Sequence, residues 1–406
     1  MLTKFPFWVM DDEDMRNPFE FPFAGKMMTQ KQPLGLAYGF ELDLLNIPTG
    51  QKGVVRRLEV IMDDLSMTPG FIEHAPTVML NICYDGELTP SVSVPYFSLC
   101  GYENTDELVG EWKAENPTAN LAYPASAFVF QYKKFETPFW VLHNPITFEE
   151  ADEIGMTLKY QIPYNNGIRI YLTTTDTEWT NEVWCTAYYQ DDLPACWNKD
   201  YRFMAERSNE STPATSNRPG TISLTQGSMT VVGTGTNFTS ADVGKYLVFG
   251  INDMLIKSVE DSTHLTVSDN DYTFNAYDST YKIQDGHIWL ERPAGKVGYL
   301  ASAVACFSSY NLEANPRVNL NPSNDFDNIN MTGGEDFFYC AFYATKTKSQ
   351  SSIGGIVAYG TRWTGYVTFH DMPLKYTNGI KGSFPNVSGS NVQNNWTAVY
   401  YEKILI

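Results

Sequence analysis

The chain has 406 residues, of which 43% are apolar, 14% aromatic and only 18% charged, and its formal net charge is −19. A chain of this length can bury more than one core, and about 100–200 residues per domain predicts two or three domains. The negative charge repels phosphate backbones and anionic lipid head groups, so binding to nucleic acid or to a membrane surface is not expected as the main function.

The composition favours an all-β fold. The chain carries 29 Gly, 22 Pro and 25 Tyr, which suit short strands joined by turns, whereas helical bundles normally carry more Glu, Lys and Ala.

The chain begins MLTKFPFWVMDDEDM, without the basic start, apolar core and small-residue cleavage site of a signal peptide, and it has no apolar run of about 18 residues. We therefore expect synthesis in a cytoplasm and a soluble product. The six cysteines include no CxxC pair and have no His at metal-ligand spacing, so neither a disulfide scaffold, nor a metal site, nor a cofactor is predicted.

A first unit is predicted over residues 1–207. Apolar and polar residues alternate in GVVRRLEVI (53–61), PTVMLNICY (76–84) and IRIYL (168–172), which is the pattern of half-buried strands. Glycine-containing turns at 84–87 and 165–167 separate these strands.

Two pairs of segments indicate an internal repeat. FWVLHNPITF (139–148), with His143, resembles YVTFHDMPLKY (366–376), with His370, and the pattern Trp-x-x-x-Tyr-Tyr recurs in the segments that begin at Trp184 and Trp396. Self-similarity of this kind predicts a duplicated unit, and two jelly-roll sandwiches in tandem are the expected architecture. Trp184 and Trp396 are expected to be buried. His143 and His370 are interpreted as half-buried residues that bond a carbonyl at a strand end.

A linker and a small domain are predicted between the copies. Residues 208–220 (SNESTPATSNRPG) have the composition of an exposed connection. Short alternating runs then continue from 221 to 283. The predicted division is a first jelly roll over 1–207, a linker with an inserted β module over 208–284, and a second jelly roll over 285–406.

The inserted segment resembles small β-modules that recur in bacteriophage tail and head fibre proteins. The resemblance spans about 65 residues and rests on the turns GTGTNF (233–238) and DVGK (242–245). The alternative is that these turns are the solvated surface of an unrelated small β domain.

The remainder resembles a glycoside hydrolase family, first named as a domain of unknown function, that acts on fructose- and arabinofuranose-containing sugars. The matching stretches are GVVRRLEV, LNICYDGELTPSVSVPYFSLCG, FWVLHNPITF, RPAGKVGYLASAV, TGGEDFFYCAFYA and GYVTFHDMPLKY. The resemblance implies a double jelly roll, a trimer, and catalysis by two glutamates.

The two family motifs fall on Glu335, in GGEDFF, and on Glu313, in LEAN. The motif around Glu335 is kept with conservative changes. In the other motif, the Gly-Asp that follows the glutamate in the family is Ala-Asn after Glu313 here. A glutamate pair suits glycoside cleavage because one carboxyl protonates the leaving oxygen while the other attacks or activates water. The alternative is that Glu335 and Asp336 form an acidic turn that accepts backbone N–H bonds.

Substrate contacts, if the chain binds sugar, are predicted at Asp336 and His370 and at two tryptophans in polar loops, Trp112 and Trp179. The pairing of a fibre-type module with a hydrolase-like double jelly roll is unusual for a metabolic enzyme and familiar in virion proteins. The leading hypothesis is therefore a structural virion protein of a tailed bacteriophage, such as a head fibre, decoration or tail component. It is expected to form a homotrimer, to bind other virion proteins, and to contact host surface glycans. The alternatives are an active glycoside hydrolase and a non-catalytic glycan-binding protein.

Overall fold

The computed structural model describes a chain built from β-strands and two short 3-10 turns, η3 (Tyr96–Cys100) and η4 (Ser240–Asp242). Among the described residues no helix is long and apolar enough to cross a membrane. The described residues are 27–63, 77–100, 134–136, 140–143, 153–177, 180–191, 200–212, 215–250, 252–267, 275–308, 317–319, 328–330, 353–359, 362–368, 374–384, 386 and 392–404.

The first unit is a sandwich of two antiparallel sheets. Its large sheet has the order β1-β11-β3-β8-β7-β6, with β9 beside β3, and its small sheet has the order β2-β10-β4-β5. The strands are β1 (Met27–Ala37), β2 (Leu42–Ile47), β3 (Gly53–Asp63), β4 (Val78–Tyr84), β5 (Val92–Pro95), β6 (Lys134–Glu136), β7 (Trp140–His143), β8 (Glu153–Leu158), β9 (Ile162–Tyr164), β10 (Ile168–Thr174) and β11 (Thr180–Asp191).

The second unit is built in the same way. Its large sheet has the order β12-β28-β21-β25-β24, with β26 beside β21, and its small sheet has the order β20-β27-β22-β23. The strands are β12 (Tyr201–Thr212), β20 (His287–Arg292), β21 (Gly298–Ser308), β22 (Arg317–Asn319), β23 (Asn328–Asn330), β24 (Ile353–Tyr359), β25 (Arg362–Thr368), β26 (Leu374–Tyr376), β27 (Ile380–Phe384) and β28 (Val392–Lys403).

The strand orders of the two units match one for one. β1-β11-β3-β8 corresponds to β12-β28-β21-β25, and β2-β10-β4-β5 corresponds to β20-β27-β22-β23. Two four-stranded sheets whose successive strands cross from one sheet to the other form a jelly roll. The all-β class and the tandem jelly rolls expected from the sequence are confirmed.

A turn at one end of each sandwich repeats atom for atom. The Asn166 side chain accepts a 2.7 Å hydrogen bond from the backbone N–H of Gly50, and Asn378 accepts the same 2.7 Å bond from Gly295. Both glycines have a positive φ, 93° and 88°, a conformation that only glycine adopts without strain. Residue 50 of the first unit therefore corresponds to residue 295 of the second.

A second repeated feature is a tyrosine packed over a strand glycine. A Cβ added to Gly53 would lie 2.4 Å from the Tyr164 hydroxyl oxygen, and one added to Gly298 would lie 2.3 Å from that of Tyr376. Burial raises the pKa of both tyrosines. Only glycine leaves room for these rings, so the pattern Gly-x-x-Gly followed later by Tyr-x-Asn-Gly-Ile marks both copies.

The Trp-x-x-x-Tyr-Tyr alignment is wrong by one residue. Tyr189 pairs with Val55, and Tyr400 pairs with Leu300, on corresponding strands. Trp184 therefore corresponds to Asn395, not to Trp396. A slip of one residue moves a side chain to the opposite face of the sheet.

The burial of the two tryptophans follows from that shift. Trp396 is buried as expected, with 0% of its surface exposed, but Trp184 points to the outer face of its sheet and is 39% exposed.

The two histidine-containing segments do not occupy the same place either. His143 ends β7, which is separated from β3 by β8, whereas the segment before His370 forms β25, which lies directly beside β21, the counterpart of β3. The equivalence of these segments is therefore wrong, although the duplication they suggested is real. His370 itself lies outside the described residues.

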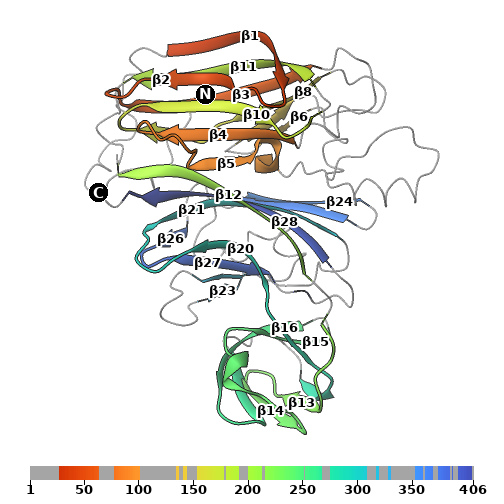
Figure 1. Ribbon diagram of the computed structural model, residues 1–406. Coiled ribbons are helices and arrows are strands. Elements are labelled where there is room, and N and C mark those ends of the chain that lie inside the picture. The colour runs from red at the N-terminus through yellow and green to blue at the C-terminus, as the bar shows by residue number, and fades with distance from the viewer. Residues whose placement is uncertain are drawn as a thin grey trace, which may run out of the picture.

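The large sheet of the second unit is buried on both faces. One face joins the core of the first unit through Tyr201, Phe203, Val399 and Tyr401. Its other face covers the small sheet, where the Trp396 ring stacks on Trp289 with centroids 5.1 Å apart. Figure 1 shows the resulting order, with the first unit above, the second below it, and β12 and β28 between their cores.

The inserted module is a strongly curved seven-stranded sheet with the order β18-β13-β14-β17-β16-β15-β19. Alternating strand residues, among them Ile222, Val231 and Leu265, fill a separate core together with Phe238 and Tyr281 from the connections between strands. The strands are β13 (Thr221–Leu224), β14 (Thr230–Thr234), β15 (Tyr246–Phe249), β16 (Asn252–Val259), β17 (His264–Val267), β18 (Ala276–Ser279) and β19 (Lys282–Gln284).

The module is inserted between β12 and β20, the counterparts of β1 and β2. In the first unit these two strands are joined by an exposed turn in which the N–H of Phe40 bonds the carbonyl of Ala37. Exposed turns tolerate insertions because few contacts depend on them. β12 spans the predicted boundary at residue 207 and pairs with β28 along its whole length. Residues 201–207, expected in the first jelly roll, and residues 208–212, expected in the linker, therefore both belong to the second unit's sheet. The division into domains otherwise stays a prediction.

Candidate functional site

The residues predicted to carry catalysis or sugar binding lie outside the described residues: Glu313, Glu335, Asp336, His370, Trp112 and Trp179. Their roles stay predictions. Three of the charged clusters that the structure describes lie at joints: between the two units, along the strands that lead to the module, and between the linker and the module.

The joint between the units is closed by Arg202 of β12. Its guanidinium forms ion pairs with Asp85 and with Glu87, the latter at 2.8 Å, in the turn after β4. The same guanidinium lies over the Tyr84 ring, 4.9 Å from its centroid, and the Tyr84 hydroxyl donates to the carbonyl of Phe203. One arginine thus fixes the end of β4 against β12.

Further hydrogen bonds between buried groups cross the same joint. The Tyr401 hydroxyl donates to the carbonyl of Gln161 at 2.7 Å, and the Tyr160 and Ser302 hydroxyls lie 2.5 Å apart. Burial raises the pKa of Tyr401 well above its ordinary value. Buried polar groups are costly unless they are paired, so these contacts specify how the two units dock.

The second joint is the neck, which we define as β12, β20 and the residues that connect them to the module. Its inner cluster centres on Arg292, whose Nε and Nη2 donate to the two oxygens of Glu402 at 2.7 and 2.9 Å. Arg292 Nη1 donates to Glu206 at 2.6 Å. Burial alone would raise the pKa of Glu402, but hydrogen bonds from Arg292 and Lys296 outweigh it and hold the pKa below its usual value.

Nearer the module, the neck is bridged by His287. Its Nε2 lies 3.1 Å from Ser208 Oγ, and its Nδ1 lies 3.3 Å from a carboxylate oxygen of Glu210. The order serine, histidine, carboxylate is that of a nucleophilic triad. However, Ser208 also donates to the carbonyl of Ile288 at 3.1 Å, and the His287 side chain is 0% exposed. The arrangement therefore joins two strands and does not present a free nucleophile.

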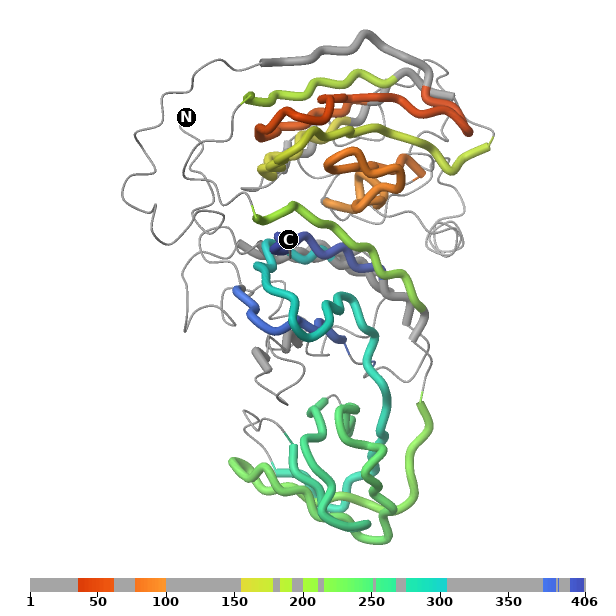
Figure 2. The backbone as a smooth tube through the Cα atoms, turned by 60° about the vertical axis from the view of Figure 1, so that its left-hand side comes forward, coloured from red at the N-terminus to blue at the C-terminus, as the bar shows by residue number. Residues whose placement is uncertain are grey.

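The third joint attaches the module. Arg218 of the linker donates to both carboxylate oxygens of Asp242 at 2.7 and 3.1 Å, and Asp242 is almost fully buried. The module also touches the second unit, because Tyr246 hydrogen-bonds Ser383 and Gln284 donates to the carbonyl of Asn386. Figure 2 shows the two passes of chain between the second unit and the module.

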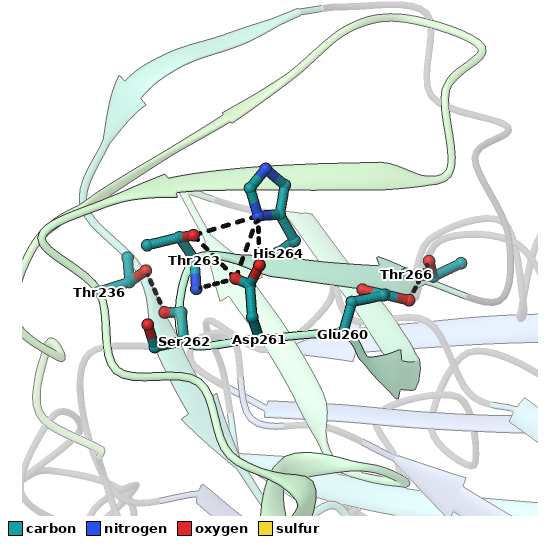
Figure 3. A network of polar contacts seen from close by, with 7 residues as sticks. All are labelled: Thr236, Glu260, Asp261, Ser262, Thr263, His264 and Thr266. Carbon is teal, nitrogen blue, oxygen red and sulfur yellow. Dashed lines mark hydrogen bonds and ion pairs between the residues drawn. The ribbon is translucent and has the colours of Figure 1, made fainter.

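The module also carries an exposed turn that resembles a polar site (Figure 3). Asp261 accepts bonds from the N–H and hydroxyl of Thr263 at 2.7 and 2.8 Å, and it lies 3.0 Å from His264 Nδ1. These bonds lower the pKa of Asp261, the backbone N–H of Thr263 contributing most. An aspartate that caps its own turn in this way stabilises the loop, so this cluster is structural.

The chemistry of these clusters is the same throughout. Each arginine is held by one or two carboxylates, and the carboxylates in turn accept neighbouring donors. Within the described ranges, no group of three or more His, Cys, Asp and Glu side chains is placed to hold a metal ion. Cys83 and Cys185 are buried free thiols, and a buried free cysteine packs as a small hydrophobic residue.

Sequence reasoning missed all three joints. Arg202, Arg292 and Arg218 bind carboxylates that are distant in sequence, so no local motif marks them. The position of His287 could have been found from the repeat, because the glycine turns align it with Leu42, a buried leucine at the start of β2. A histidine in place of a core leucine indicates a buried polar contact at that position.

Comparison with known proteins identifies no family. No family model matches the chain, and no curated protein matches it. Among solved structures, a chain of the Sputnik virophage structure determined by cryo-EM is 8% identical, with 97% of this chain and 90% of that chain covered and a TM-score of 0.22. A TM-score of this size does not establish a shared fold.

Proposed function

We propose that the chain is a structural protein of a bacteriophage virion that carries the inserted module outward on the neck. The observation that carries the proposal is that three arginines form ion pairs at the joints described above. Arg202, Arg292 and Arg218 each bind carboxylates across a joint. Charges committed in this way set the relative positions of folded parts, which is what a building block requires.

Three further elements of the proposal rest on resemblance. The module is of fibre type, and the host-facing ligand is a surface glycan. The chain forms a homotrimer, and the trimer binds other virion proteins. The module's position supports the first of these, because it lies at the end of the molecule away from the first unit (Figure 1).

The test is to purify particles that encode this chain and to measure its copy number by quantitative mass spectrometry. A fixed copy number per particle is expected. Absence from particles whose other structural proteins are present would overturn the proposal. Light scattering of the isolated chain tests the trimer, and a monomeric mass at physiological concentration would exclude it.

An activity assay on the same preparation distinguishes a structural protein from an active glycoside hydrolase. A structural protein releases no reducing sugar from furanoside-containing glycans. Release that disappears in Glu335→Gln would establish the enzyme instead. Glycan-array binding that survives Glu313→Gln and Glu335→Gln would indicate a binding protein without catalysis.

A further inference from the structure

His287 lies where the chain passes twice between the second unit and the module. Its ring, on the returning strand β20, contacts Ser208 and Glu210 on the departing strand β12. Beyond these residues the next described polar bond between the two passes joins Thr215 to Gln284, at 2.9 Å. The ring is therefore a buried side chain that joins β12 to β20 at the end of the neck nearer the module.

Among the described residues, few charges face this ring. From β12 it meets the Glu210 carboxylate, and its cross-strand neighbour on β27 is Phe384, which carries no charge. The ion pairs of Arg292 with Glu206 and Glu402 lie further along the same strands, at the far end of β20. Glu210 is 68% exposed, so water screens its attraction for a charged ring.

The hydrogen bonds around the ring can be satisfied in two ways. A neutral imidazole donates from Nδ1 to Glu210 and accepts the Ser208 proton at Nε2. A protonated ring donates from both nitrogens, and Ser208 then turns its proton to the Ile288 carbonyl, 3.1 Å away. The hydrogen bonds survive protonation, so its main cost is a positive charge in a site from which water is excluded.

We propose that His287 is an acid-sensitive latch, which holds the two strands of the neck together when neutral and releases them when protonated. This regulation of the neck does not depend on the chain being a virion component. The first unit has no such latch, because Leu42 fills the corresponding position.

The direction of the pH dependence follows from linkage. Burial lowers the pKa of His287, against the opposing effect of Glu210, whereas a ring released to water has the ordinary value of about 6.5. Below that pH the open neck binds more protons than the closed neck, so closure weakens as pH falls. The opening constant rises by up to about tenfold per pH unit until the pH reaches the pKa of the closed state.

The experiment is hydrogen exchange of the full chain from pH 7.5 to pH 5.0, corrected for intrinsic exchange and read in peptides that cover 207–212 and 286–292. In the wild-type chain, opening of these peptides should increase severalfold below about pH 6.5, with the module core unchanged. His287→Leu, the residue of the first unit, should abolish the pH step. His264→Gln, at an exposed histidine of the module, should keep it.

Glu210→Gln provides a second variant that leaves the buried ring in place. Loss of the counter-charge should lower the closed-state pKa of His287 further, so the opening constant should rise from the same onset near pH 6.5 but level off at a lower pH than in the wild-type chain. The proposal is overturned by neck protection that does not change between pH 7.5 and 5.0, by the same step in His287→Leu, or by opening in Glu210→Gln that levels off at a higher pH than in the wild-type chain. If His287→Leu does not fold, the Glu210→Gln comparison decides.

Discussion

At the scale of single residues, the two copies differ by exchanges of volume at corresponding core positions. Leu44, Ile170 and Cys185 of the first unit correspond to Trp289, Gly382 and Trp396 of the second, by the register that the glycine turns establish. Interiors are packed as densely as crystals, so a tryptophan in place of a leucine requires space from a neighbour. Gly382 supplies it, since an added Cβ would lie 2.4 Å from two atoms of the Trp289 indole.

We therefore expect Gly382→Ala to lower the free energy of unfolding by about 1–3 kcal/mol, because it overpacks the second unit's core. Thermal and denaturant unfolding followed by tryptophan fluorescence measures the change. The double variant Gly382→Ala with Trp289→Leu, which approaches the first unit's arrangement, should recover part of the loss. Equal stability of Gly382→Ala and the wild-type chain would show that the indole can move aside.

At the scale of elements, the linker is attached to the module by an ion pair between Arg218 and the buried carboxylate of Asp242. Asp242 of η4 also accepts a bond from the N–H of Thr239 at 2.9 Å, so it holds both the linker and its own turn. Removal of one partner from a buried pair leaves an uncompensated charge.

Arg218→Ala should accordingly destabilise the module by about 3 kcal/mol, with faster hydrogen exchange in β15 and β16. Lys245→Ala is the matched control, because Lys245 and Asp285 form an exposed pair 3.7 Å apart, and such pairs contribute about 0–1 kcal/mol. If both variants lose the same stability, the burial of Asp242 is not the cause.

At the scale of the whole molecule, the repeat explains why, among the described residues, the second unit's large sheet is covered on both faces and the first unit's is covered on one. Val304, Val399 and Tyr401 of the second unit pack against the first unit. At the corresponding positions of the first unit's outer face stand Glu59, Tyr188 and Gln190, by the same register. Arg56 bonds Gln190 there at 2.6 Å, and Arg57 lies over the Tyr188 ring. Charge and hydrogen bonds on this face disfavour the stacking of a further unit, which would otherwise continue head to tail.

If residues of that face are replaced by their counterparts from the second unit, the face should no longer resist stacking against another molecule. We expect Arg56→Ala with Glu59→Val and Gln190→Tyr to self-associate at concentrations where the wild-type chain keeps a constant mass in light scattering, because an exposed apolar patch then forms. Arg169→Ala with Asp43→Val, on the small sheet of the first unit, is the control for loss of charge elsewhere on the surface. This variant should not self-associate. Association of both variants alike would argue against a specific face.

The sequence by itself determined the all-β class, the duplication and the existence of a module between the copies, since strand alternation, turn glycines and composition are local properties of the chain. It predicted a candidate glutamate pair, which stays a prediction because Glu313 and Glu335 lie outside the described residues. The register of the repeat escaped it, as Trp184 and Trp396 show, because a slip of one residue alters the sequence pattern little and the buried face completely.

Only the tertiary structure decided the joints. Arg202 meets Asp85 and Glu87, and His287 meets Ser208 and Glu210, across more than 70 residues of chain. Such pairs form because the sheets bring distant strands within hydrogen-bond distance, and a side chain's partner in space leaves no mark on its neighbours in sequence.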